Sequence, residues 1–187
     1  MKQATRYVTA AALSGMMLAL PAAAHPGHLD ATGLAAGLLH PLTGLDHLLA
    51  LLAVGLWSRQ QPRGVVLAPV FLVLMALGAS CAGDLMDGML PALETSIAAT
   101  VLLLGGLAAL ALRMPPQMAV LLVGGCGFLH GLAHGRELAG MASGAGLLAA
   151  SALVMFLGMV VAPGERRRRM VGAAIGALGL GLLAGFV

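Results

Sequence analysis

Residues 34–57 read LAAGLLHPLTGLDHLLALLAVGLW, and this stretch decides the fold. It contains 24 residues, of which only His40, Asp46 and His47 are ionisable. A run of roughly 20 apolar residues is long enough to cross the hydrocarbon core of a bilayer as an α-helix. A charged group at the centre of such a helix costs about 2.5–3.5 kcal/mol. The stretch therefore predicts a transmembrane helix that carries a functional site.

Five further apolar stretches follow the first one along the chain. They cover residues 65–83, 93–112, 118–134, 141–162 and 171–187. Over the whole sequence, 60% of the residues are hydrophobic and only 9% are charged. Soluble domains contain about 25% charged residues, so a water-soluble fold is excluded. We predict an all-α integral membrane protein, built as a bundle of six transmembrane helices with short loops.

The N-terminus has the pattern of a secretory signal peptide. Lys2 and Arg6 supply positive charge, residues 8–20 form a short apolar region, and the small residues that follow suit signal peptidase. We predict a cleaved signal peptide at residues 1–24 and a six-helix transmembrane domain at residues 25–187. The alternative is an uncleaved first transmembrane helix, for which the apolar region is short.

The arginines define the orientation in the membrane. Seven of the eight arginines after residue 24 follow the first, third and fifth apolar stretches, namely Arg59, Arg63, Arg113 and the run 166–169. Only Arg136 falls on the other side, so the positive-inside rule places both mature termini outside the cytoplasm. We predict a multi-pass protein of the bacterial inner membrane with a periplasmic N-terminus. The arginine run then anchors the topology against membrane lipid, and no nucleic-acid partner is expected.

Glycine is abundant, with 27 residues in the chain. Gly127, Gly131 and Gly135 recur at every fourth position of the fourth stretch. Small residues at this spacing let the backbones of two membrane helices approach closely. We predict close helix packing along this face rather than glycine hinges.

The six histidines fall in three pairs: His25 and His28, His40 and His47, and His130 and His134. Ionisable residues inside a membrane persist mainly where they pair, bind or conduct. The pair His25 and His28 lies at the predicted mature N-terminus, where it is either an ion-collecting site or incidental.

The other two pairs lie in the first and fourth stretches. Positions i, i+4 and i+7 share one face of a helix, so His130, His134 and Glu137 point the same way. His40 and His47 are about 10 Å apart along a straight helix, too far to bind one ion unaided. We expect Pro41 to begin the helix, which makes His40 a loop or cap residue.

Both pairs fall in the outer half of the membrane under the predicted orientation. A site shared between these two helices would offer imidazole nitrogens and carboxylate oxygens, which suit Ni²⁺, Co²⁺, Zn²⁺ or Fe²⁺. A purely structural role for these histidines, as hydrogen-bonding groups between helices, is the alternative.

Two motifs carry a resemblance to a known family. The segment from His40 to His47 fits the pattern H-x(5)-D-H, and the segment from His130 to Glu137 fits H-G-x-A-H-G-x-E. With the signal peptide, these motifs make the chain resemble the HupE/UreJ family of nickel and cobalt permeases, which are associated with hydrogenase and urease maturation. One departure is visible, because Leu129 separates Phe128 from the first histidine of the second motif. The resemblance implies that six residues are needed for metal transport: His40, Asp46, His47, His130, His134 and Glu137.

The expected function is therefore secondary transport of Ni²⁺ or Co²⁺, with the metal as substrate and without a prosthetic group or enzymatic activity. No Walker-type phosphate-binding motif occurs in the sequence, so we expect no ATP hydrolysis. Two rival functions use the same residue types. One is an intramembrane hydrolase with a catalytic Zn²⁺, and the other is a haem-binding electron carrier with histidine axial ligands.

Overall fold

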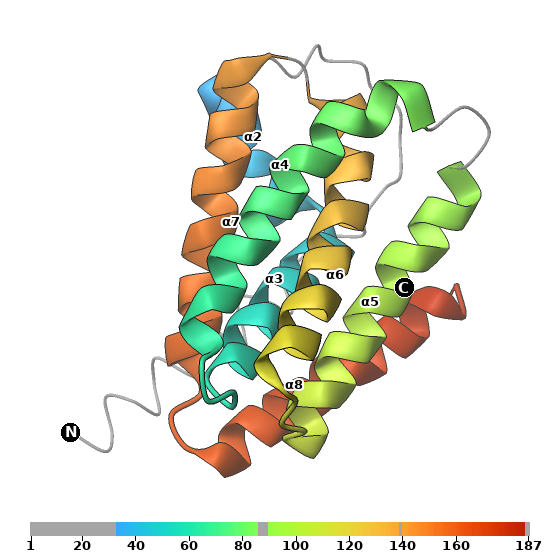
Figure 1. The fold of residues 1–187 in the computed structure, drawn as a ribbon. Helices are drawn as coiled ribbons and strands as arrows, with labels where there is room; N and C mark the ends of the chain where they lie inside the picture. The colour runs from blue at the N-terminus through green and yellow to red at the C-terminus, as the bar shows by residue number, and fades with distance from the viewer. Residues whose placement is uncertain (1–32, 86–89, 139, 186–187) are drawn as a thin grey trace.

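A computed structural model describes residues 33–85, 90–138 and 140–185, and these ranges contain helices and no strands. The predicted signal peptide, His25 and His28 lie outside the described residues. Figure 1 shows the helices arranged as a bundle. In chain order they are α2 (Leu34–Thr43), α3 (Leu45–Ser58), the short 3₁₀ helix η1 (Gly64–Val66), α4 (Leu67–Leu85), α5 (Leu90–Leu110), α6 (Pro116–Glu137), α7 (Met141–Val161) and α8 (Glu165–Leu183).

Four of these helices, α4 to α7, are long and apolar enough to cross a membrane. The pair α2 and α3 passes the same test as one span, but the two helices are bent by 85° at their junction. Helix α8 begins with Glu165 and four arginines, so its apolar part is shorter than a full span. The described residues therefore form four apolar spans, or five if the bent pair is one span, where the sequence predicted six.

The start of the first predicted span differs from expectation. Pro41 does not begin a helix and His40 is not a cap, because both lie inside α2, which starts at Leu34. The helix ends soon after the proline, and Gly44 adopts an extended conformation between α2 and α3. Proline disturbs mainly the turn that precedes it, so the break after Thr43 lies at Gly44 and not at the proline itself. The hydroxyl of Thr43 donates to the His40 carbonyl at 2.8 Å and satisfies one acceptor at this end.

Helix α3 forms the centre of the bundle. Its residues from Leu49 to Ser58 are almost all buried, and Trp57 is completely inaccessible to solvent. It packs against α5 and α7, and Figure 1 shows it behind α4 and α6. In the first turn of α3, the His47 side chain is 12% exposed and the Asp46 side chain 31% exposed, so neighbouring helices cover both only in part.

Glycines mediate the closest helix contacts, as the sequence predicted. A Cβ atom at Gly131 would collide with the Met75 carbonyl of α4, and one at Gly135 would collide with the Ala79 carbonyl. Gly172 on α8 meets the α5 backbone in the same way. Helices α4 and α6, and α5 and α8, therefore pack backbone to backbone.

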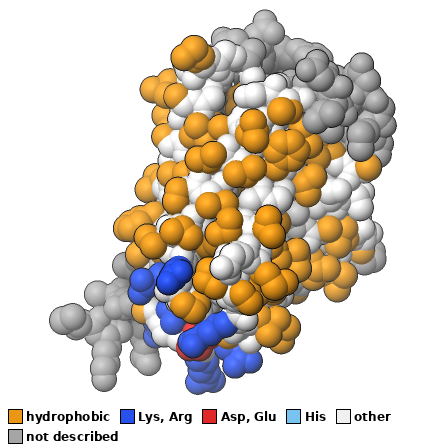
Figure 2. Space-filling view, in the orientation of Figure 1, with side chains coloured by type: hydrophobic (Ala, Val, Ile, Leu, Met, Phe, Trp, Pro, Cys, Tyr) orange, Lys and Arg blue, Asp and Glu red, His pale blue; other side chains and the backbone are white. Residues whose placement is uncertain are grey.

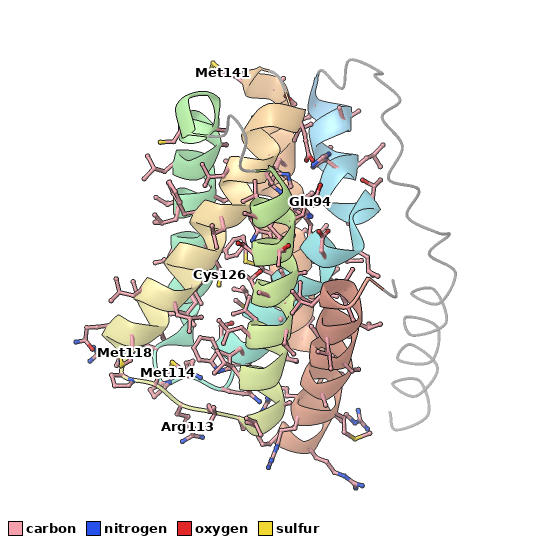
Figure 3. The ribbon with its side chains drawn as sticks, turned by 90° about the vertical axis from the view of Figure 1, so that its right-hand side faces the viewer. Glu94, Arg113, Met114, Met118, Cys126 and Met141 are labelled. Carbon is pink, nitrogen blue, oxygen red and sulfur yellow. The ribbon has the colours of Figure 1, made fainter. Side chains whose placement is uncertain are left out.

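The two ends of the bundle differ in chemistry. We call the end that carries Arg59, Arg63, Arg113 and the run 166–169 the arginine end. Figure 3 shows Arg113 near the bottom of the molecule and Met141 at the top. The indole nitrogen of Trp57 donates to the Leu112 carbonyl at 2.9 Å, which fixes the end of α3 to the segment between α5 and α6. The histidines of α2, α3 and α6 lie towards the opposite end.

Candidate metal centre

Helices α2, α3 and α6 bring four imidazole rings together. The centroid of the His40 ring lies 6.3 Å from that of His47 and 4.8 Å from that of His134. The His47 ring lies 4.4 Å from His134 and 5.2 Å from His130. Asp46 and Glu137 contact the same group, so the structure gathers all six residues that the family resemblance implies for metal transport.

Three donors converge at the more exposed side of this cluster. The His40 Nε2 atom lies 2.9 Å from His134 Nδ1 and 2.9 Å from Glu137 Oε2. The His134 Nδ1 atom lies 3.7 Å from the same carboxylate oxygen. We call His40, His134 and Glu137 the surface triad.

The spacing of the surface triad matches what one metal ion requires. Two donors at about 2.0–2.1 Å from an ion and at right angles to each other lie about 2.9 Å apart. Both contacts of His40 have this separation of 2.9 Å. The separation of 3.7 Å between His134 and Glu137 corresponds to an angle of about 130° at the ion. The triad can therefore surround one cation with only small side-chain shifts, and two nitrogens with one oxygen suit Ni²⁺, Co²⁺ or Zn²⁺.

Two further imidazoles have nitrogens without partners. The His47 Nδ1 atom lies 2.6 Å from Asp46 Oδ1, and the His130 Nδ1 atom lies 2.9 Å from the Cys126 carbonyl. An ionised carboxylate and a carbonyl can only accept, so each Nδ1 carries the proton and each Nε2 holds a lone pair. Both Nε2 atoms are buried and have no hydrogen-bond partner. We call His47 and His130 the buried pair.

An unpaired buried acceptor is costly, so two of them in one place need an explanation. A cation that binds either lone pair would supply a missing partner, although among the described residues only the surface triad has three donor atoms within 4.8 Å of one another. The fixed tautomers strengthen this argument, because a metal-binding histidine usually donates its second ring nitrogen to a carboxylate or a carbonyl. Asp46 and the Cys126 carbonyl provide these two kinds of acceptor.

Exposure varies widely within the cluster. The exposed fraction is 52% for the Glu137 side chain, 23% for that of His40 and 12% for that of His47, but 2% for His134 and 1% for His130. Figure 3 places Cys126, whose carbonyl holds His130, about halfway between the two ends of the bundle. The donors thus form a path from an exposed mouth to the interior.

Glu137 lies just beyond the apolar part of α6, which ends at Gly135. Partial burial alone would raise the pKa of its carboxyl group. The contacts with His134 and His40 outweigh this effect and hold the pKa of Glu137 well below its usual range. The surface triad therefore presents a carboxylate rather than a carboxylic acid.

Sequence reasoning missed three contributors to the site. The Phe71 ring of α4 lies 5.5 Å from the His130 ring and covers one of its sides. The Cys126 carbonyl accepts from the His130 ring and orients it. A Cβ atom at Gly44 would lie 3.0 Å from Asp46 Oδ1, so the glycine leaves room for the pair of Asp46 and His47. The Phe71 contact is tertiary and leaves no sequence signal, whereas the position of Cys126 four residues before His130 could have indicated the carbonyl contact.

Comparison with known proteins gives a clear match. The chain matches the family model described as "HupE / UreJ protein" over residues 12–182. Protein HupE of Rhizobium leguminosarum bv. viciae is 40% identical over 182 residues, which cover 90% of this chain and 94% of that protein. No solved structure matches the chain. The family match includes α2, α3 and α6 and therefore the whole histidine cluster.

Proposed function

The chain belongs to the HupE/UreJ family, and from this premise we propose that it is a secondary permease for the uptake of Ni²⁺ or Co²⁺. The family is associated with nickel and cobalt uptake, and its names link it to hydrogenase and urease accessory functions. We place the protein in the bacterial inner membrane as a multi-pass protein with a periplasmic mature N-terminus. Its role is to supply metal for hydrogenase or urease maturation.

One observation carries the proposal: the surface triad and the buried pair form a continuous set of donors that leads from solvent to the interior. The ring of His47 joins the two groups, since it lies 4.4 Å from His134 and 5.2 Å from His130. A hydrated ion exchanges water for the triad first and then moves to the two Nε2 atoms of the buried pair. Several sites of moderate strength favour conduction over trapping.

The driving force does not need ATP. One charge that crosses 100 mV releases about 2.3 kcal/mol, so a dication gains about 4.6 kcal/mol. This energy supports roughly a thousandfold accumulation inside the cell. The ligands bind metal only when they are deprotonated, and the ionised Glu137 together with the fixed tautomers of His47 and His130 meets this condition.

Uptake of radiolabelled Ni²⁺, with Co²⁺ and Zn²⁺ as competitors, tests the proposal. His47→Ala and His130→Ala each remove one lone pair of the buried pair and should abolish most of the uptake. Cys126→Ala is the matched control, because it deletes the thiol but keeps the carbonyl that holds His130. Full uptake by either histidine variant would contradict the proposed path.

A second function has one specific observation in its favour. Two histidines, one glutamate and an open position form a common ligand set of catalytic Zn²⁺ sites, and the surface triad has this composition. The protein would then be a metal-dependent hydrolase within the membrane. Reconstitution in liposomes distinguishes the two functions, because a permease delivers Ni²⁺ into the lumen, whereas a hydrolase retains its metal and consumes a substrate.

A further inference from the structure

A pocket opens at the arginine end, on the far side of the molecule from the histidine cluster. It has a volume of about 470 Å³ and lies between the end of α3, the last turns of α7 and the start of α8. Two arginines line it, Arg59 and Arg168, together with the apolar side chains of Phe156, Met159 and Val160. The pocket is thus cationic at one side and apolar at the other.

The two arginines retain unused hydrogen-bonding capacity. Arg168 makes two long contacts of 3.4 Å, one from Nη1 to the Ala162 carbonyl and one from Nη2 to Glu165 Oε2. Its Nε atom is buried and has no hydrogen-bond partner. The Arg59 side chain makes no hydrogen bond or ion pair with any described residue. A guanidinium carries five donors that suit a phosphate or a carboxylate, so the pocket can accept an anion.

The apolar wall continues onto the outer face of α7. Phe156 is 58% exposed and Val160 is 51% exposed, and Leu153 is exposed one turn further from the pocket. Figure 2 shows Lys and Arg side chains gathered at the lower end of the visible face, directly below a surface of hydrophobic side chains. In a membrane, this boundary is the level at which lipid headgroups meet acyl chains.

We propose that this pocket binds the headgroup of an anionic phospholipid. The phosphodiester lies between Arg59 and Arg168, and an acyl chain follows Phe156 and Val160 along α7. The charges agree with this occupant, because Glu165 balances part of the charge of Arg168 and leaves a site for a singly charged phosphodiester. The apolar wall favours a lipid over free phosphate, since free phosphate would leave that wall exposed.

The test uses the full chain in a non-ionic detergent, with phosphatidylglycerol, phosphatidylcholine of the same acyl chains, and inorganic phosphate as probes. Native mass spectrometry measures bound lipid, and thermal unfolding measures protection. We expect phosphatidylglycerol to bind in preference to phosphatidylcholine. Arg59→Gln and Arg168→Gln should each weaken its binding about tenfold, which is the loss expected for a charge-assisted hydrogen bond.

Arg167→Gln is the matched control, because it removes the same charge from an exposed position on α8 outside the pocket. Lipid binding by this variant should change by less than about twofold, since Arg167 is exposed and does not line the pocket. Arg59→Gln guards against misfolding, because the Arg59 side chain is exposed and makes no hydrogen bond or ion pair with a described residue. Equal losses in Arg167→Gln and Arg59→Gln would overturn the proposal. So would equal binding of both lipids, or protection by inorganic phosphate alone.

Discussion

Asp46→Asn is the most informative substitution at the site, because it changes charge while it preserves shape. The Asp46 Oδ1 atom accepts from the His47 backbone N–H at 2.7 Å and from the His47 ring at 2.6 Å. The backbone N–H can only donate, so the amide oxygen of asparagine takes the place of Oδ1. The His47 ring then keeps its proton on Nδ1 and its lone pair on Nε2. Only the negative charge is lost.

The magnitude follows from the kind of hydrogen bond. The contact of 2.6 Å has the short length of a charge-assisted bond. Such a bond contributes about 1.5–3 kcal/mol and a neutral one about 0.5–1.5 kcal/mol, so the substitution costs about 1–1.5 kcal/mol. Metal binding should weaken about tenfold. Asp46→Ala also frees the ring to rotate and change tautomer, and its effect should approach a hundredfold, the upper range for groups that orient metal ligands.

The assay is the concentration of Ni²⁺ that gives half-maximal uptake, measured in vesicles that contain equal amounts of each protein. We expect the order wild type, Asp46→Asn, Asp46→Ala, with about a tenfold step between neighbours. The control is Glu94→Gln, which removes an exposed carboxylate of α5 that Figure 3 shows in the upper half of the bundle. If Asp46→Asn took up Ni²⁺ as well as the wild type, or as poorly as Asp46→Ala, the account of tautomer control would be wrong.

Three further predictions test the triad, the packing and the helix break. Glu137→Gln should reduce Ni²⁺ uptake about a hundredfold because the surface triad loses its anionic donor, whereas Glu94→Gln should match the wild type. Gly131→Ala should destabilise the protein by about 1–3 kcal/mol in thermal unfolding, since its Cβ would meet a backbone carbonyl of α4. Gly125→Ala on the same helix should be neutral or slightly stabilising, because its Cβ meets nothing within 4 Å. Gly44→Ala should raise the Ni²⁺ concentration for half-maximal uptake severalfold, because its Cβ would lie 3.0 Å from Asp46 Oδ1 and 3.1 Å from His47 Nδ1. An unchanged concentration would mean that Asp46 and His47 are not held tightly.

The sequence predicted those features that depend on local pattern. Apolar length and the arginine positions predict α4 to α7 closely, and the fourfold spacing from Gly127 to Gly135 predicts the close contact with α4. The sixth stretch was predicted at residues 171–187, whereas α8 begins six residues earlier, at Glu165, and ends at Leu183. The break after α2 was not predicted. Pro41 was expected to begin the helix because proline is favourable in the first turn, but the helix starts earlier, at Leu34.

The sequence also predicted which residues meet, but not how each imidazole is oriented. Positions i and i+4 place His130 and His134 on one face of α6. Which ring nitrogen holds the proton depends on the neighbouring acceptor, and that acceptor is a side chain for His47 and a backbone carbonyl for His130. The division into a surface triad and a buried pair thus arises from tertiary structure.

The break at Gly44 solves a problem that helix periodicity creates. In a continuous helix, His40 and His47 would be about 10 Å apart along the axis, and one of them would lie out of reach of the histidines of α6. The bend of 85° brings their rings to 6.3 Å. A break inside a membrane leaves backbone groups that need partners, and here Thr43 bonds the His40 carbonyl while Asp46 bonds the His47 N–H. Because Asp46 also orients the His47 ring, the residue that stabilises the break positions a ligand as well, so any substitution that straightens this segment should disable the site together with the fold around it.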